Sequence, residues 1–437
     1  SYRKDMLVPA RIYASEKLLE EIFRDKSLEQ LINVATLPGI QKYALVMPDA
    51  HEGYGFPIGG VAAMDAETGV ISPGGIGYDI NCGVRLLKSE LKFKDVENRL
   101  DELAAELYGA IPSGVGKGGA FKLADKDFDE VLKNGVSWMI KNGYGESGDP
   151  ERIESNGHLE NADPSKVSAH AKSRGRDQLG TKGAGNHFVE VDRVDEIFSE
   201  KEAKEFGLSK DQIVVLIHTG SRGLGHQVAT DYIRTMLKVM PKYGITLPDR
   251  ELACAPFNSP EGQDYFNAMS AAANFAWANR QMITYEVREV WQKMFNSKLS
   301  ILYDVAHNIG KLEEYPSASS GQVMKVVVHR KGATRSFPGQ PVLIPGSMGT
   351  ASYVLAGAEG SMESAFGSTC HGAGRRMSRH AAKKEVRGAE LKTELEKEGI
   401  HIASGSMSGL AEEAPQAYKD VNEVGDVVSR AHLAQKV

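Results

Sequence analysis

The sequence predicts a mixed α/β (α+β) fold, because apolar runs of strand length and long helical segments both occur along its 437 residues. Three runs, at 213–217, 301–305 and 323–328, are apolar and short, as is typical of buried strands. A fourth strand is expected over 84–87. The segment 264–295 is long, Ala-rich and helical, and its scattered aromatic and Met residues indicate a buried helix.

In chain order, we expect helices over 15–23, with Ser15 as the N-cap, and over 27–35. Asp49 and His51 are expected among turn residues. A helix over 94–108 precedes the segment S-G-V-G-K-G-G at 113–119, which lacks P-loop spacing and is interpreted as a flexible loop. Polar residues predict long loops over 143–172. Further helices are expected over 227–240 and, as one charged surface helix, over 376–398.

Composition excludes several classes of protein. The chain is 41% hydrophobic and 25% charged, as in ordinary globular proteins. Its net charge of −6 argues against a globally basic nucleic-acid binder but leaves room for a local basic groove. Three widely spaced cysteines do not make a disulfide framework. With no signal-peptide core and no apolar run of about 18 residues, a cytoplasmic location is expected.

The loop P-G-G-I-G-Y-D-I-N-C-G at 73–83 is the first candidate site. Four glycines surround Asp79 and Cys82, and so many glycines indicate a tightly specified backbone. The loop can therefore present one carboxylate and one thiol to the same point, a pair that suits a transition metal. The alternative is a tight turn that holds a buried, inert cysteine.

Three histidines lie at strand ends. His187 occupies a Gly-Asn turn before an expected strand, His218 ends one strand and His307 follows another. The sheet holds such side chains rigidly, although each alone is more typical of an ordinary hydrogen-bonded residue. Together with Asp79 and Cys82 they suffice for two metal ions if the thiolate bridges. Thiolate and imidazole alone suggest zinc, whereas a carboxylate and a phosphate substrate admit manganese.

The segment H-G-A-G-R-R-M-S-R begins with His371, which has small neighbours. Arg375, Arg376 and Arg379 follow at helical spacing, and guanidinium groups match phosphate geometry. A histidine in this setting can attack phosphorus and form a covalent intermediate. The alternatives are a helix N-terminus with a solvated arginine face and, less favoured, a Cys370–His371 pair, because sequence neighbours seldom face each other.

Eight segments together resemble the RtcB family of RNA-splicing ligases. They occur in order between positions 47 and 379, which makes the match far more specific than any single motif. The segments are M-P-D-A-H-E-G-Y-G-F-P-I-G-G, P-G-G-I-G-Y-D-I-N-C-G, G-A-G-N-H-F-V-E, H-T-G-S-R-G-L-G-H, A-H-N at 306–308, H-R-K-G-A-T-R, P-G-S-M-G-T-A-S-Y and H-G-A-G-R. The resemblance implies one catalytic domain over residues 1–437, with central layered β-sheets, surrounding helices and a deep metal-binding cleft.

The resemblance also implies a reaction. Such an enzyme joins RNA 3′-phosphate or 2′,3′-cyclic phosphate ends to 5′-hydroxyl ends, in tRNA splicing or RNA repair. It uses GTP and two Mn²⁺ ions, and it proceeds through a guanylylated histidine and an RNA-3′-pp-5′-G intermediate. An archease-type activating protein is a further partner that the resemblance suggests.

Site residues follow by motif match. Cys82 would bridge the metals, Asp79 and His187 would complete one metal site, and His218 and His307 the other. Guanylylation would fall on His371. Nucleotide contacts are implied for Asn186, Phe188, Glu190, Ser352, Ala373, Arg375 and Tyr418, and phosphate contacts for Arg222, Lys331 and Arg379.

Glu190 is expected to select guanine. Phe188 and Glu190 share one face if this segment is extended, so Phe188 can flank the base while Glu190 meets its edge. Guanine offers two adjacent donors that a carboxylate can accept, whereas adenine presents an acceptor. A solvated Glu on a strand edge is the alternative.

Two positions depart from the family pattern. Glu52 stands where the family often has a larger aromatic residue or Gln. Family members usually end in a hydrophobic tail closing with Lys-Gly, but this sequence stops at A-Q-K-V, through truncation or through divergence, so Lys436 is not assigned the role of the tail lysine.

Two other functions compete with a ligase. A dinuclear metallohydrolase could remove RNA-end phosphates, but it needs no covalent nucleotide, so His371 discriminates against it. A non-catalytic RNA-binding module is disfavoured, because metal-ligand residue types are present and such modules show a clearer basic or aromatic signature.

Overall fold

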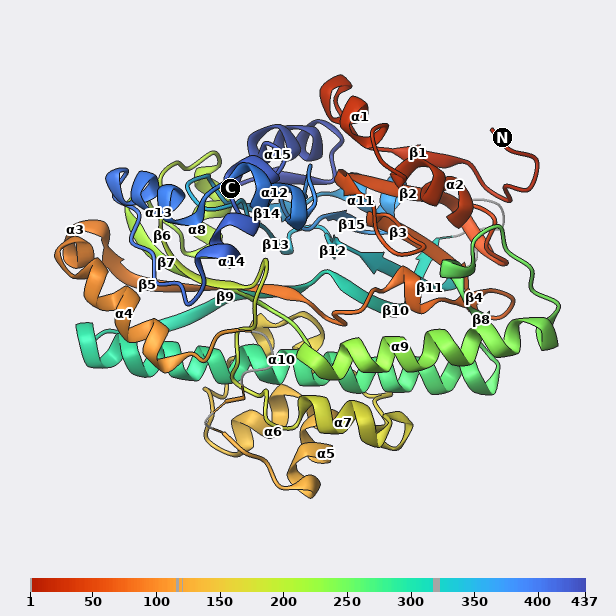
Figure 1. The fold of residues 1–437 in the computed structure, drawn as a ribbon, viewed down its shortest axis with the longest axis horizontal. Coiled ribbons are helices and arrows are strands. Elements are labelled where there is room, and N and C mark those ends of the chain that lie inside the picture. Colours follow the sequence, from red (N-terminus) through yellow and green to blue (C-terminus); the bar gives the residue numbers. More distant parts are fainter. Residues whose placement is uncertain (1, 115–117, 120, 317–322) are drawn as a thin grey trace.

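The computed structural model describes residues 2–114, 118–119, 121–316 and 323–437. Strands form the middle of the molecule and helices cover them on both sides (Figure 1). Helices α9 (Arg222–Val239) and α10 (Pro260–Phe295) run side by side along one side of the strands. Helices α5 (Asp125–Asn134) and α6 (Val136–Lys141) pack against α10 from beyond. The predicted mixed α/β fold with layered sheets is therefore confirmed.

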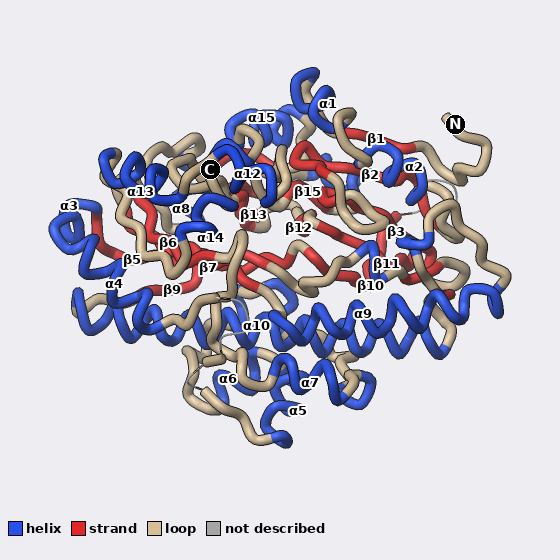
Figure 2. The backbone as a smooth tube through the Cα atoms, in the orientation of Figure 1, coloured by secondary structure: helices blue, strands red, loops and turns tan. Residues whose placement is uncertain are grey.

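Two larger sheets carry the architecture, seen as the red segments of Figure 2. One has five strands in the order β1 (Ala10–Ile12), β2 (Ile40–His51), β3 (Ile58–Asp65), β11 (Val323–Lys331) and β10 (Asn308–Pro316). The other has four strands in the order β6 (Phe188–Arg193), β7 (Gln212–Thr219), β5 (Gly83–Lys92) and β9 (Leu299–Ala306). Smaller sheets join β13 (Pro341–Ile344), β14 (Tyr353–Gly357) and β16 (Ala434–Lys436), β12 (Ala333–Arg335) with β15 (Ser368–Cys370), and β4 (Val70–Ile71) with β8 (Ala255–Pro256).

The remaining helices are mostly short and lie outside the sheets. They are α1 (Glu16–Ile22), α2 (Ser27–Val34), α3 (Phe93–Val96), α4 (Leu100–Ala110), α7 (Ala169–Gly175), α8 (Glu200–Phe206), α11 (Glu359–Ala365), α12 (Arg379–Glu385), α13 (Gly388–Lys397), α14 (Met407–Glu412) and α15 (Val421–Arg430). Among the described residues, no helix is long and apolar enough to cross a membrane.

The register of the four-stranded sheet decides where the site lies. Val84 of β5 pairs with His218 of β7, and Gly83 pairs with Ala306 at the end of β9. Phe188, the first residue of β6, also pairs with His218. The chain positions of Cys82, His187, His218 and His307 are therefore brought to one end of this sheet.

Most expected elements are confirmed. Ser15 caps α1 and accepts a hydrogen bond from the Leu18 amide at 3.2 Å, and α2 follows as expected. The strands at 213–217, 301–305 and 323–328 are the centres of β7, β9 and β11, and 84–87 lies in β5. The helix at 94–108 is divided into α3 and α4 by a 3₁₀ turn at Glu97–Arg99. The loop expected at 113–119 includes residues outside those described.

Long helix α10 confirms the helix predicted over 264–295 and begins four residues earlier, at Pro260. It is buried over most of its length because α9, α5, α6 and β7 all pack against it. Residues 268–284 are all buried, and a helical segment enclosed on every side has no solvent face, which explains why its apolar residues do not follow a single stripe. Helix α9 likewise confirms the helix over 227–240. The polar stretch at 143–172 is mainly loop with short 3₁₀ turns, although α7 already begins at Ala169.

Three expectations were wrong. The single helix over 376–398 is two helices, because Val386 is extended and Gly388 lies against the backbone of Met407, where a Cβ would come within 1.9 Å of the Met407 carbonyl oxygen. Arg375 and Arg376 precede α12, so the arginines that follow His371 are not at helical spacing. Asp49 and His51 also lie in strand β2 and not among turn residues.

Candidate active site

A cleft of about 1810 Å³ lies between the two larger sheets and the C-terminal helices. Its wall includes the end of the four-stranded sheet, residues of β2, β3 and β11, and loops that follow β13 and β15. All five expected metal ligands and the expected nucleophile line it: Asp79, Cys82, His187, His218, His307 and His371.

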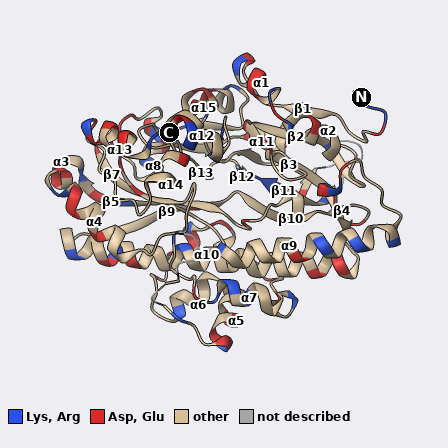
Figure 3. Cartoon of the chain, in the orientation of Figure 1, with Lys and Arg blue, Asp and Glu red and all other residues tan. Residues whose placement is uncertain are grey.

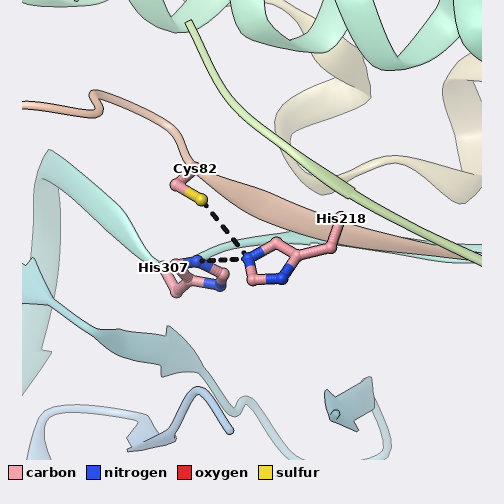
Figure 4. Close-up of side chains that lie close together, drawn as sticks. All are labelled: Cys82, His218 and His307. Carbon is pink, nitrogen blue, oxygen red and sulfur yellow. Dashed lines mark hydrogen bonds between the residues drawn. The ribbon is translucent and has the colours of Figure 1, made fainter. Parts of the chain in front are cut away.

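The five ligand-type side chains form two groups that share Cys82. Asp79, Cys82 and His187 make one group, and Cys82, His218 and His307 the other, with the ligand atoms of each group within 4.8 Å of one another. The Cys82 Sγ atom lies 3.4 Å from His187 Nε2 and 3.3 Å from His218 Nε2. His218 Nε2 is 3.3 Å from His307 Nε2. Figure 4 shows Cys82, His218 and His307 pointing toward one another.

Local backbone contacts hold the loop that carries Asp79 and Cys82. The Cys82 amide donates to the Asp79 carbonyl at 2.9 Å, and the His307 amide donates to the Cys82 carbonyl at 2.9 Å. The Ser221 amide donates to Asp79 Oδ1 at 3.0 Å, while Asp79 Oδ2 lies 2.9 Å from His187 Nε2. These contacts tie the loop to the ends of β7 and β9, so the donor atoms converge from three directions.

The electrostatics of the cluster suit metal ligation. Burial, reinforced by the neighbouring histidines, lowers the pKa of His218 and of His307 well below the usual value, so both rings are neutral at pH 7. Burial opposes ionisation of Asp79, but the hydrogen bond and charge of His187 outweigh it and lower the Asp79 pKa to about 2. Neutral imidazoles and an ionised carboxylate are the forms that bind metal ions.

Cys82 completes the donor set. Burial and the Asp79 carboxylate raise the pKa of the Cys82 thiol well above its usual value. Coordination to a metal ion deprotonates a thiol outright, so a cation here would convert the thiol to the thiolate that bridges both groups. Lone pairs of sulfur, nitrogen and oxygen converge on the same space, an arrangement that a cation stabilises. The donor set therefore fits two metal ions.

His371 lies beside this cluster, with its ring centroid 4.9 Å from that of His307. Buried Asp49 accepts from the His371 amide at 3.0 Å, and its Oδ2 atom lies 2.5 Å from His371 Nδ1. This contact places the ring proton on Nδ1 and leaves the Nε2 lone pair free. Sequence reasoning noted Asp49 only as a turn residue; its position at the end of β2, in the M-P-D-A-H segment, was the signal available.

Comparison with known proteins assigns the chain to a family. A sequence model described as tRNA-splicing ligase RtcB matches residues 30–437. The chain belongs to the RtcB family. It is 55% identical over 454 residues to the tRNA-splicing ligase RtcB of Thermococcus kodakarensis, covering 100% of this chain and 94% of that protein. It is 52% identical to the protein of the same name from Archaeoglobus fulgidus over 455 residues, which cover 100% of this chain and 94% of that protein. The RNA-splicing ligase RtcB of Mycobacterium tuberculosis is 49% identical over 424 residues, which cover 93% of this chain and 97% of that protein.

The nucleotide residues implied by the RtcB resemblance are almost all in the cleft wall. Ser352 is the one among them that does not line the cleft; it is exposed, and its Oγ accepts from the Gly346 amide at 3.0 Å. Phe188 packs against His218 with ring centroids 5.3 Å apart, so it links the candidate metal ligands to the residues expected to contact the nucleotide. The residues that line the cleft are Asn186, Phe188, Glu190, Ala373, Arg375 and Tyr418.

Glu190 lies in β6 with Asp192 two residues further on, and both line the RtcB cleft. Burial and the Asp192 charge raise the pKa of Glu190 well above its usual value. Burial raises the pKa of Asp192 to about 6. Two neighbouring carboxyl groups therefore compete for protons at the place where guanine is expected.

Two of the arginines after His371, Arg375 and Arg379, are paired with one carboxylate, whereas Arg376 Nη2 lies 3.8 Å from Glu21 Oε1. Arg375 Nη1 lies 3.0 Å from Glu413 Oε2, and Arg379 Nε lies 3.1 Å from Glu413 Oε1. The Tyr418 hydroxyl donates to the same carboxylate. Both guanidinium groups face the cleft. A phosphate group could bind them in place of the Glu413 carboxylate, because guanidinium groups bind carboxylates and phosphates with the same geometry.

The other two expected phosphate contacts differ in their surroundings. Lys331 is buried, donates to the carbonyl oxygens of Tyr54 at 2.6 Å and Phe56 at 3.0 Å, and has its pKa lowered to about 7 by burial. Arg222, at the start of α9, does not line the cleft; its Nε donates to Thr181 Oγ1 at 3.1 Å. Basic and acidic residues are interspersed over the outer helices (Figure 3).

Proposed function

We propose that this chain is an RNA ligase of tRNA splicing or RNA repair that joins RNA 3′-phosphate or 2′,3′-cyclic phosphate ends to 5′-hydroxyl ends. The names of its relatives, tRNA-splicing ligase and RNA-splicing ligase RtcB, support this proposal. The observation that carries it is the placement of His371, oriented by Asp49, beside a five-residue donor cluster in one cleft.

The first step is guanylylation of His371. With its proton held on Nδ1 by Asp49, His371 attacks the α-phosphorus of GTP through Nε2. A nitrogen–phosphorus bond forms, the bond to the β-phosphate oxygen breaks, and pyrophosphate leaves. Asp79, Cys82 and the three cluster histidines would hold two Mn²⁺ ions, which when bound offset the negative charge that develops on the phosphate oxygens.

The second and third steps take place in the same cleft. Water first opens a 2′,3′-cyclic phosphate end by breaking the bond to O2′, which leaves a 3′-phosphate and a 2′-hydroxyl. The RNA 3′-phosphate takes GMP from His371 to give RNA-3′-pp-5′-G, and the 5′-hydroxyl then attacks the activated phosphate and releases GMP. Arg375 and Arg379 exchange the Glu413 carboxylate for phosphate oxygens, which they can grip in bidentate fashion. Phe188 flanks the guanine and Glu190 meets its edge, while Asn186 contacts the nucleotide phosphate.

The same proposal covers the setting of the enzyme. Residues 1–437 act as one catalytic domain, which the family match over 30–437 supports. The protein works in the cytoplasm, and an archease-type protein activates it. Arg222 and Lys331 contribute further phosphate contacts.

A ligation assay tests this function. The protein is mixed with GTP, Mn²⁺ and RNA bearing cyclic-phosphate and 5′-hydroxyl ends, and joined product is followed on a denaturing gel, with and without an archease-type protein. Joined RNA that requires both GTP and Mn²⁺ is the expected result. Loss of the end phosphate without joining would instead identify a metallohydrolase, and a protein that binds the RNA without changing it would contradict both.

A further inference from the structure

The guanidinium group of Arg280, on helix α10, lies directly behind the candidate metal cluster. Arg280 is fully buried, and each of its five N–H groups donates to an oxygen. Nε and Nη2 donate to the Asp304 carboxylate at 2.8 and 3.0 Å. Nη1 donates to the carbonyls of Asn81 and Thr219, both at 2.8 Å, and Nη2 also donates to Asn81 Oδ1 at 2.9 Å.

These acceptors belong to three segments that carry candidate ligands. Asn81 precedes Cys82 and Thr219 follows His218. Asp304 lies in β9, the strand that leads into His307. One side chain thus joins the backbone next to the thiol, the backbone next to one imidazole and the strand that presents the other.

The two residues that flank Cys82, Asn81 and Gly83, both lie against Arg280. Asn81 has a φ of 51°, a left-handed conformation that surrounding contacts must hold. Its Nδ2 donates to the Ala273 carbonyl of α10 at 2.7 Å. A Cβ at Gly83 would lie 2.8 Å from Arg280 Nη2, so only glycine lets the strand approach the guanidinium this closely.

The imidazoles lack the usual means of orientation. A metal-binding histidine normally donates its second ring N–H to a protein acceptor, and this contact fixes the ring. The Nδ1 atoms of His187, His218 and His307 are buried and have no such partner among the described residues. Their placement therefore depends on the backbone that carries them.

We propose that Arg280 is a positioning residue of the dinuclear centre, which sets the spacing of Cys82, His218 and His307 through the backbone beside them. The inference rests on the proposed metal binding at these residues. Lysine cannot replace arginine here, because an ammonium group has three donors from one atom and cannot span the five acceptors that the planar fork reaches.

Arg85 provides a matched control. It is equally buried and also pairs with Asp304, with Nε donating to Oδ2 at 2.8 Å. Its Nη1 donates to Gln281 Oε1 at 2.7 Å and to Thr284 Oγ1 at 3.0 Å, both side chains of α10. The two arginines thus share the buried ion pair, but the hydrogen bonds of Arg280 alone reach the Asn81 and Thr219 carbonyls.

The test is Mn²⁺ binding by the metal-stripped full chain, measured by calorimetric titration and by metal analysis after dialysis, with thermal melts of every variant. Arg280→Lys should weaken Mn²⁺ binding about 10- to 100-fold, the range typical when a contact that orients metal ligands is lost. Arg85→Lys should lower the melting temperature comparably and keep the parent affinity for Mn²⁺. Asn81→Gly keeps the left-handed backbone and removes one Arg280 acceptor, so it should weaken Mn²⁺ binding by less than Arg280→Lys.

Four outcomes decide the matter. Parent-like Mn²⁺ binding by Arg280→Lys, or an equal loss in Arg85→Lys, overturns the positioning role while leaving the metal centre in place. A parent chain that binds no Mn²⁺ removes the metal centre and with it this inference. If Arg280→Lys does not fold, Asn81→Gly decides, because parent-like affinity in that variant overturns the role.

Discussion

Asp49 and His371 are 322 positions apart in the chain, yet Asp49 Oδ2 lies 2.5 Å from His371 Nδ1. Asp49 is fully buried at the end of β2, and His371 directly follows β15. The contact fixes both the orientation of the imidazole and the position of its proton. The proposed nucleophile is thus prepared before any substrate binds.

The first prediction concerns this pair. Asp49→Asn should slow guanylylation of His371 on the order of 10²-fold, about 2.7 kcal/mol in the barrier, because a mispositioned nucleophile with the wrong tautomer loses its near-attack geometry. The rate is measured as transfer of label from α-labelled GTP to the protein. Asp101→Asn is the control: the exposed Asp101 lies 2.5 Å from His401 Nδ1 and should not affect the rate. Unchanged labelling in Asp49→Asn would rule out this role.

The second prediction concerns Cys82, which we expect to bridge two metal ions. Cys82→Ala should bind fewer than two Mn²⁺ ions and lose ligation activity, while its circular dichroism stays that of the parent. Metal analysis after dialysis measures the content. Cys254→Ala is the control, because Cys254 is buried in an apolar cluster and burial raises its thiol pKa to about 12. If Cys82→Ala still binds two metal ions, the Cys82 thiol is a buried packing residue and not a metal ligand.

The third prediction uses Gly220, which lies directly against Asp79. A Cβ at this position would lie 2.3 Å from Asp79 Oδ1 and 2.5 Å from Oδ2. Gly220→Ala should therefore displace the carboxylate and weaken binding at the Asp79–His187 site by about tenfold or more, while the Cys82–His218–His307 site still fills.

A Mn²⁺ titration of Gly220→Ala that resolves the two sites is the measurement. Gly109→Ala in α4 is the control, since a Cβ there would have no described atom within 4 Å beyond its own stretch of helix. That substitution should leave metal binding alone and stabilise the helix by about 0.5–1 kcal/mol. Two equally strong sites in Gly220→Ala would contradict the placement of Asp79 as a ligand.

Part of this structure could be predicted from sequence because its signals are local. Apolar runs that end at His218 and His307 identify strands and their ends without any knowledge of pairing. The four-stranded register then brings those ends together, which spacing alone does not indicate. Asp49 could not be assigned, because its relation to His371 depends on contact between β2 and the end of β15. Arg280 was hidden for the same reason, within a helix whose residues were interpreted as core.

The expected helix over 376–398 was wrong for a tertiary reason. Local propensity favours a helix through Val386 and Arg387, but the contact of Gly388 with the Met407 backbone turns the chain there. A contact between segments about twenty residues apart leaves no periodic signal. The break matters, because it positions α12 and α14 so that Lys383 can pair with Glu412 at 2.9 Å.

The fourth prediction concerns guanine selection by Glu190. Two hydrogen bonds from guanine to the carboxylate, each contributing roughly 1.5–3 kcal/mol, imply a GTP-over-ATP preference on the order of 10²–10⁴. Glu190→Ala should raise the GTP requirement steeply and shrink this preference, with Mn²⁺ binding unchanged. Labelled GTP and ATP in competition for His371 measure the ratio. If the variant discriminates as the parent does, guanine is recognised elsewhere in the cleft.

The last prediction is a pH dependence of that preference. Burial and the Asp192 charge raise the pKa of Glu190, so protonated Glu190 is favoured at low pH and can accept only one of the two guanine hydrogen bonds. The GTP-over-ATP ratio should therefore rise with pH as Glu190 loses its proton, by about 10- to 10²-fold for the one bond regained. Asp192→Asn removes the like charge, lowers the Glu190 pKa and should move the rise to lower pH.

The ratio of labelled adducts between about pH 5 and 8 is the measurement, and Glu190→Gln, which cannot ionise, should give a flat profile. A parent ratio that is independent of pH, or an Asp192→Asn profile that moves to higher pH, would show that the carboxylate form of Glu190 does not read guanine.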